Sequence, residues 1–168
     1  MFIFGHAGLT IAAARAVDRD VDLRWAVLLA LGPDLLDKPL SRLIPEIVNH
    51  NTRAFGHTLL FSLLVFTALL LRQRRVRPAL VLWACYAGHF VLDGMWRNTN
   101  PVILLWPALG AFPPNLRGPR MSWYMAAMIA GELAGLAVIH RLGLFDRRRL
   151  AGFLRTGRVE ARAADRPA

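Results

Sequence analysis

A histidine and an aspartate interrupt an otherwise apolar stretch, GHFVLDGMW, at residues 88–96. His89 and Asp93 are four residues apart, so on a helix their side chains lie on the same face, one turn apart. Inside a membrane, such a carboxylate costs roughly 2.5–3.5 kcal/mol of insertion free energy. Imidazole and carboxylate together suit Zn²⁺, Mn²⁺ or Fe²⁺, whereas Ca²⁺ prefers oxygen ligands. The pair therefore predicts a metal site; the alternative is an ion pair between Asp93 and Arg97.

Four polar residues outside this stretch are candidates for the same site, namely His6, Asp34, Asp37 and His57. Each of the three that could bind the ion directly also has a structural interpretation. His6 could simply lie at a membrane interface, Asp34 could serve a turn after Pro33, and His57 could cap a helix. We favour His57 as a ligand and leave His6 open between the two interpretations.

Two further polar residues have weaker claims. His50, in VNHNTRAFGH, reads as an ordinary loop residue. Glu132, in AGELAG, could face the site or hydrogen-bond a neighbouring helix. The glycines that flank it, Gly131 and Gly135, form a GxxxG pattern that indicates close helix packing more readily than chemistry.

The elements that must position these residues are apolar blocks. Hydrophobic residues make up 55% of the chain, and the mean hydropathy is +0.38. Blocks of this kind are typical of a multi-pass membrane protein. We therefore expect an all-α fold, a transmembrane bundle of about five helices, with helices near residues 3–16, 23–36, 55–71, 78–96 and 121–140.

Two other features limit the architecture. The run PVILLWPALGAFPP at 101–114 is broken by four prolines, which suits a re-entrant or surface loop better than a helix. The single cysteine, Cys85, excludes an internal disulfide and a zinc knuckle built from cysteines.

The arginines predict the orientation of the bundle. The loop at 72–77 and the segment after residue 140 are both arginine-rich, and the positive-inside rule places both in the cytoplasm. This use of arginine, together with binding of anionic lipid head groups, also accounts for the net charge of +10, so we expect membrane lipids and no nucleic acid as partners. The expected organisation is a membrane domain at 1–140 and a basic cytoplasmic tail at 141–168, either an amphipathic helix on the membrane or partly disordered.

Helix parity then brings the candidates together. If the loop at 72–77 is cytoplasmic, the helix at 55–71 begins outside and the helix at 78–96 ends outside. Counting back, the end of 23–36 and the start of 3–16 are outside as well. All the candidate ligands and Asp37 should therefore meet at the outer level of the bundle.

Four stretches carry a resemblance to a known family. LGPDLLDKP, TRAFGHTLLFSLL, YAGHFVLDGM and NPVILLWPALG resemble, in order, the blocks of the YdjM-like family of inner-membrane proteins described as metal-dependent hydrolases. The resemblance covers roughly residues 1–140 and implies a location in the inner membrane. In the family's second block, two histidines flank an Arg-Gly-x-Thr core; here Thr52 stands in place of the first histidine and Gly56 in place of the threonine.

A more distant similarity concerns the order of the ligands. The series His, Asp, His, His-x-x-x-Asp is similar to the zinc-dependent phospholipase C and single-strand nuclease superfamily of all-helical phosphoesterases. Their later His-x-x-x-Glu has no counterpart, because Glu132 and His140 fall in the wrong order and spacing. The resemblance therefore implies one or two divalent ions, with zinc the expected metal.

These expectations describe a membrane-bound metal-dependent hydrolase. His57, His89 and Asp93 would hold one ion, while Asp34 and His6 would bind a second ion or orient the first set. The activated water would attack an ester or phosphoester, with lipid-linked esters among the candidate substrates. Asp37 would orient a histidine or act as general base. The alternatives are a structural or regulatory protein with a degenerate metal site and, less favoured, a transporter.

Overall fold

The computed structural model describes residues 3–97, 100–114 and 122–159, and in these ranges every regular element is helical. The expectation of an all-α fold is confirmed. The elements are α1 (Ile3–Val17), α2 (Leu23–Leu43), the short 3₁₀-helix η1 (Phe55–His57), α3 (Leu59–Gln73), α4 (Val76–Leu92), α5 (Asn100–Leu104), α6 (Ser122–Arg141) and α7 (Arg147–Thr156).

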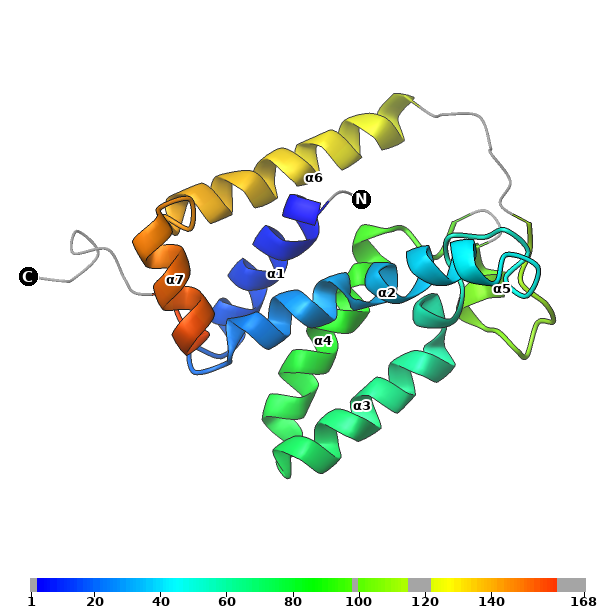
Figure 1. Ribbon diagram of the computed structural model, residues 1–168, viewed down its shortest axis with the longest axis horizontal. Coiled ribbons are helices and arrows are strands. Elements are labelled where there is room, and N and C mark those ends of the chain that lie inside the picture. The colour runs from blue at the N-terminus through cyan, green and yellow to red at the C-terminus, as the bar shows by residue number, and fades with distance from the viewer. Residues whose placement is uncertain (1–2, 98–99, 115–121, 160–168) are drawn as a thin grey trace, which may run out of the picture.

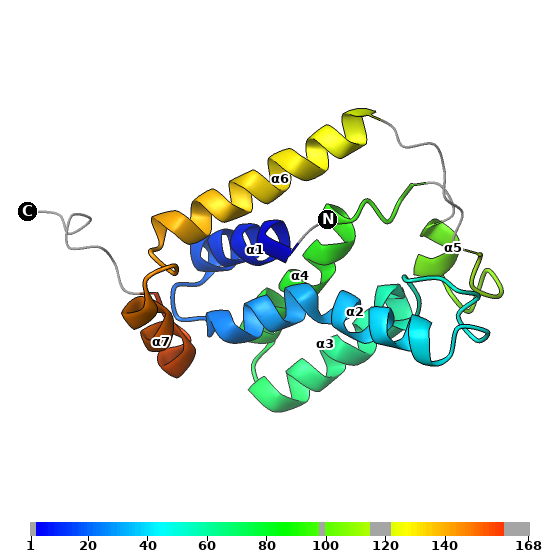
Figure 2. The same cartoon turned by 45° about the horizontal axis from the view of Figure 1, so that its top comes forward.

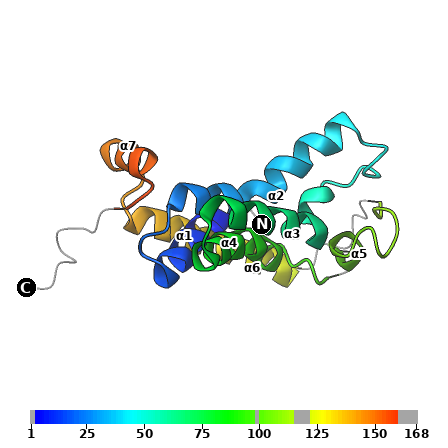
Figure 3. The same ribbon diagram turned by 90° about the horizontal axis from the view of Figure 1, so that it is seen from below.

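The helices pack around α2, which contacts α1 and α4, while α3 packs against α4 and α6 packs against α1 (Figure 1). Figure 2 shows α6 running alongside α1. One group of buried apolar residues joins α1, α2 and α4 to Phe153 of α7, and another lies around η1, α5 and the end of α4. Seen from below, α7 and α5 lie at opposite ends of the molecule (Figure 3).

Local signals explain where several helices begin and end. Asp22 caps α2 by accepting from the Arg24 N–H, and Thr58 caps α3 by accepting from the Phe61 N–H. Helix α7 begins after Asp146 and ends at Gly157, whose φ of 69° is left-handed. The cap at Thr58 makes α3 begin four residues later than the predicted start at 55, and residues 55–57 form η1 instead.

The contact between α1 and α6 depends on two glycines. A Cβ at Gly8 would overlap the backbone of Gly135, and a Cβ at Gly135 would overlap the backbone of Phe4 and Gly5. Glu132 lies nearby and accepts hydrogen bonds from the N–H groups of Phe4 (3.1 Å) and Gly5 (2.7 Å). Of the two interpretations of Glu132, the structure therefore supports the hydrogen bond to a neighbouring helix.

The expectation of membrane-crossing helices is not confirmed. None of the helices in the described residues combines the length and the apolar composition that a membrane span requires. Two of the segments expected to cross, 55–71 and 78–96, form helices of 15 and 17 residues, α3 and α4. At about 1.5 Å per residue, both are shorter than the ~30 Å thickness of the hydrocarbon core. Capping at Thr58 and termination at Leu92 are the reasons for these short lengths.

The run expected to be a loop and the predicted tail, for which a helix was one of two expectations, both contain helices. The proline-rich run at 101–114 starts within α5, and its Ile103 and Phe112 are buried. In the segment after residue 140, α7 packs on the body of the protein: Phe153 is buried, and the Arg24 guanidinium donates to the carbonyls of Leu154 and Arg155. Residues 160–168 lie outside the described residues. The predicted boundary at 140 stays a prediction.

Candidate metal centre

Four candidate residues meet at a buried point between α2, η1 and α4. Asp34 comes from the middle of α2, His57 ends η1, His89 lies in the last turn of α4, and Asp93 is its C-cap. One ligand atom from each lies within 4.8 Å of the others, in an arrangement that could hold a metal ion. The side chains of His57 and His89 are fully buried, while that of Asp34 is 18% exposed, so the group opens to the surface beside Asp34.

The spacing of the four ligand atoms suits a small divalent cation. The Nε2 atoms of His57 and His89 are 3.1 Å apart. Oδ1 of Asp34 lies 4.0 Å from each Nε2, and Oδ2 of Asp93 lies 3.9 Å from each. Ligands bound to a tetrahedral ion at ~2.0–2.2 Å are roughly 3.3–3.6 Å apart. The distances in this group lie around those values.

The tautomer of His57 is determined by Asp37. His57 Nδ1 lies 2.7 Å from Asp37 Oδ2, and Asp37 also accepts the N–H groups of Ala54 (2.7 Å) and Gly56 (2.8 Å). Because the carboxylate accepts on every side, Nδ1 of His57 carries the proton and donates it. The lone pair of His57 is therefore on Nε2, which faces the other candidate ligands.

The tautomer of His89 is determined by a backbone carbonyl. His89 Nδ1 lies 2.7 Å from the carbonyl oxygen of Ala30, which can only accept, so Nδ1 must donate. The lone pair of His89 is therefore also on Nε2.

The two tautomers together leave two lone pairs facing each other. With both Nδ1 atoms protonated, neither neutral ring has a hydrogen to place between Nε2 atoms that are 3.1 Å apart. A cation bound by both nitrogens removes this repulsion, and two carboxylates complete a donor set that suits zinc. The residues present therefore fit a divalent metal.

Close backbone packing holds η1 beside α2. A Cβ at Gly56 would lie 2.9 Å from the carbonyl oxygen of Pro33 and 3.2 Å from Asp37 Oδ1. The Tyr86 hydroxyl donates to the carbonyl of Gly56 from α4. Gly56, noted above as a departure from the family's second block, thus allows the close approach on which the Asp37–His57 contact depends.

Asp93 has neighbours on both of its oxygens. Arg53 donates to Oδ2 from Nη2 (2.9 Å) and Nε (3.1 Å), and His6 Nε2 lies 3.5 Å from Oδ1. The His6 ring stacks on the His89 ring, with centroids 4.2 Å apart. His6 therefore lies beside the four-residue group, next to the carboxylate oxygen that faces away from the two Nε2 atoms.

Asp37 lies behind His57 rather than among the ligand atoms. It contacts Nδ1, on the opposite side of the ring from Nε2, and its side chain is fully buried. His50 is exposed in the loop before η1, and His140 is exposed at the end of α6. Together with the contact of Glu132 to α1, these positions separate the three residues from the site.

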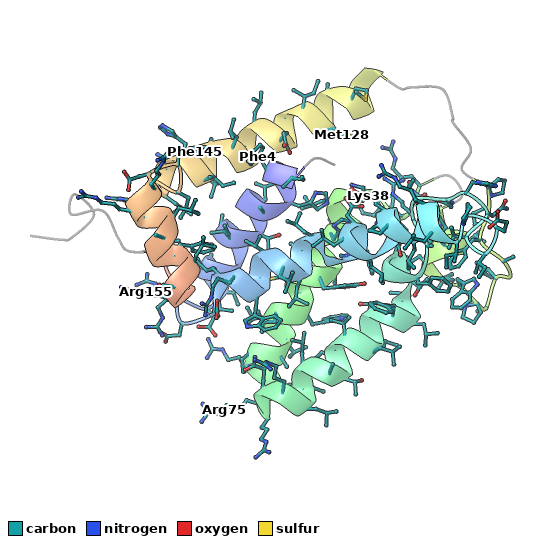
Figure 4. The ribbon with its side chains drawn as sticks, viewed as in Figure 1. Phe4, Lys38, Arg75, Met128, Phe145 and Arg155 are labelled. Carbon is teal, nitrogen blue, oxygen red and sulfur yellow. The ribbon has the colours of Figure 1, made fainter. Side chains whose placement is uncertain are left out.

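Two cations at the site were not expected from the sequence. Arg53 contacts Asp93, and Lys38 Nζ lies 2.6 Å from Asp34 Oδ2. The spacing of Asp34 and Lys38, one helical turn, was a signal that could have identified the second pair. Arg53 approaches from a loop forty residues before Asp93, and no local pattern indicates that contact. Figure 4 shows Lys38 well apart from Arg75, at the start of α4, and from Arg155, in α7. The site therefore lies away from the arginines of these two segments.

The comparisons with known proteins found one match. A family model described as YdjM inner membrane protein matches residues 1–156. No curated protein and no solved structure matches the chain.

Proposed function

The chain belongs to the YdjM inner membrane protein family, and we propose that it is a metal-dependent hydrolase of the inner membrane. The observation that carries the proposal is the 3.1 Å separation of the Nε2 atoms of His57 and His89, beside Asp34 and Asp93, with each Nδ1 atom against an acceptor. We propose zinc as the ion. Bound there, it would act as a Lewis acid and lower the pKa of a water molecule toward about 7.

The surrounding residues have separate tasks in this proposal. Asp37 keeps His57 in the tautomer that presents Nε2, and the Ala30 carbonyl does the same for His89. Because both oxygens of Asp37 are occupied and the side chain is buried, we assign it a positioning role in preference to that of general base. His6 would orient Asp93, or would supply a ligand for a second ion next to Asp93.

The charges around the site favour a phosphoester over a carboxylic ester. Asp34, Asp93 and Asp37 bring three negative charges to the site. One divalent ion, Arg53 and Lys38 would together bring four positive charges, so an excess of one positive charge remains. Both cations are partly exposed, with side chains 31% and 57% accessible. An anionic phosphoester matches this excess, and membership of an inner-membrane family favours one linked to a lipid.

Metal analysis combined with activity tests the proposal. The purified full chain, His89→Ala and the exposed-loop control His50→Ala should be compared for zinc content and for hydrolysis of bis-p-nitrophenyl phosphate and p-nitrophenyl acetate. We expect zinc and phosphodiester hydrolysis in the wild type and in His50→Ala, and neither in His89→Ala.

Other results would separate the competing functions. A folded wild-type protein that binds no divalent metal would refute the metal centre. Bound zinc without hydrolysis of either ester would favour the structural or regulatory alternative, in which the altered second block leaves a site that binds but does not react. The location of the C-terminus in the cytoplasm stays a prediction.

A further inference from the structure

An open pocket of about 660 Å³ lies between α1, α6 and the segment that follows α7. Four arginines line it. Arg15 lies in α1 and Arg141 in α6, while Arg19 follows α1 and Arg158 follows α7. None of the residues that line the pocket is acidic. The pocket therefore gathers positive charge from parts of the chain that are far apart in the sequence.

Most of this charge has no partner within the described residues. In residues 3–97, 100–114 and 122–159, no carboxylate forms an ion pair with Arg15, Arg19 or Arg141. Arg158 contacts Asp20 at 3.4 Å, and the Asp20 side chain is 87% exposed. Guanidinium groups bind phosphate oxygens in pairs, so the pocket suits a phosphate group.

The pocket also has an apolar wall. Val138, Leu142 and Val159 line it, and all three are partly exposed. A free inorganic anion makes no use of such a wall, whereas the glycerol and the first carbons of a phospholipid do. The ligand that matches both parts of the pocket carries a phosphate and an apolar chain.

Helix α7, next to the pocket, has the character of a membrane-surface helix. Leu150 is 40% exposed and Leu154, one turn later, is 59% exposed, so they form an apolar stripe on its outer face. Arginines at 147–149 and 155 flank this stripe. Exposed leucines among arginines are typical of helices that lie on anionic membranes.

We propose that this pocket binds the head group of an anionic phospholipid, while α7 rests on the lipid surface. The proposal is independent of the metal centre, because none of the pocket residues belongs to that site. The pocket would anchor α7 and the neighbouring ends of α1 and α6 in the head-group region of the membrane.

Binding of short-chain phospholipids to the full-length protein in an uncharged detergent tests this proposal. The pocket variant carries Arg15→Gln and Arg141→Gln, and the matched control carries Arg75→Gln and Arg77→Gln, which are exposed at the start of α4. Both variants lose the same charge. For dihexanoyl phosphatidylglycerol we expect binding about 30-fold weaker in the pocket variant and nearly unchanged in the control. A third variant, Arg15→Lys with Arg141→Lys, should show an intermediate loss because the charge stays but the paired donors do not.

Four results would overturn the proposal. Equal weakening in the pocket and control variants would mean that net charge alone attracts the lipid. Equal binding of dihexanoyl phosphatidylcholine would remove the role of the head-group charge. Inorganic phosphate bound as tightly as the lipid would indicate a small-anion site, and a single-stranded oligonucleotide bound more tightly would indicate nucleic acid. Zinc content of each variant, measured in parallel, checks that the metal centre is retained.

Discussion

At the scale of single residues, the chemistry depends on which nitrogen of each histidine holds the proton. Asp37 accepts the Nδ1 proton of His57, and the Ala30 carbonyl accepts that of His89. Neither acceptor belongs to the group of candidate ligand atoms. A residue outside the candidate ligand set could therefore control the affinity of the site for an ion. This gives Asp37 a role that differs from those of Asp34 and Asp93, although all three are aspartates.

Asp37→Asn should weaken zinc binding by about 10- to 100-fold without abolishing it. The amide cannot accept the His57 proton and both backbone N–H groups, so the imidazole loses its enforced tautomer. Competition titration against a chromogenic zinc chelator measures the change. Asp20→Asn, on an 87% exposed side chain, is the control and should bind zinc like the wild type. Unchanged affinity in Asp37→Asn would contradict the positioning role.

Asp93→Asn should lose most of the bound zinc, because an amide is a poor ligand in place of a carboxylate. Leu92→Asn introduces the same side chain one position away, off the face that carries His89 and Asp93, and should keep its zinc. Elemental analysis of the two purified variants compares them directly. Equal zinc in wild type and Asp93→Asn would remove Asp93 from the centre and leave it as the ion-pair partner of Arg53.

At the scale of helices, close contacts and caps hold the elements that carry the site. Helix α1 brings His6 to Asp93, and α1 is held in turn by Gly135 and Glu132 of α6. At the other end of the molecule, Asp22 caps α2 and Arg24 bonds the last carbonyls of α7. The position of each helix is therefore set by a few contacts between distant segments.

Gly135→Ala should destabilise the protein by about 1–3 kcal/mol, because the added methyl overlaps the backbone of α1. Gly152→Ala, in α7, is the matched control: its Cβ would meet nothing within 4 Å, and a helical alanine should stabilise by up to about 1 kcal/mol. Thermal unfolding in detergent, followed by circular dichroism, measures both. Equal stability of the two variants would show that α1 and α6 do not depend on this contact.

Asp22→Ala should cost about 1 kcal/mol through loss of the cap on α2. The hydrogen bond from the Arg24 side chain lowers the pKa of Asp22 below its usual value of 3.8. A carboxyl with a lowered folded-state pKa stabilises the protein above its unfolded pKa and loses this effect as the pH falls through the folded one. The difference between wild type and Asp22→Ala should therefore be present at pH 7 and shrink below about pH 4. A difference independent of pH would mean that the charge of Asp22 is irrelevant.

At the scale of the whole molecule, the candidate ligands and the clusters of arginine lie in different regions. The candidate metal centre joins α2, η1 and α4, with α1 beside it, whereas the arginines of α7 and of the α3–α4 turn lie away from it (Figure 4). Because the candidate centre connects three elements that are separate in the sequence, an ion bound there would also hold the fold together.

Removing the metal should therefore lower the midpoint of thermal unfolding, and adding zinc back should restore it. A ligand that binds only the folded state stabilises by about 2.7 kcal/mol at a free concentration 100 times its dissociation constant. His57→Ala should unfold at the same temperature with chelator and with zinc, since it lacks a ligand. A zinc-dependent shift of equal size in His57→Ala would place the ion elsewhere in the protein.

The sequence by itself determined the composition, the helical character and the family of this protein. Apolar blocks of helical length predict an all-α fold, and the four blocks that resemble the YdjM-like family are supported by a match over residues 1–156. The spacing of His89 and Asp93 was enough to place both on one helix face, because an interval of four residues is a local property of a helix. Helix lengths were less predictable, since the caps at Thr58 and Asp93 shorten α3 and α4 relative to the apolar blocks.

Only the tertiary structure decided how the site is completed. The carbonyl of Ala30 has no signature in the sequence, since every residue carries one, yet it sets the tautomer of His89. The contact of Arg53 with Asp93 joins residues 40 positions apart. The contact of Arg24 in α2 with Leu154 in α7 joins residues 130 positions apart. Such contacts depend on how whole helices pack, and the pattern along one helix carries no record of its neighbours.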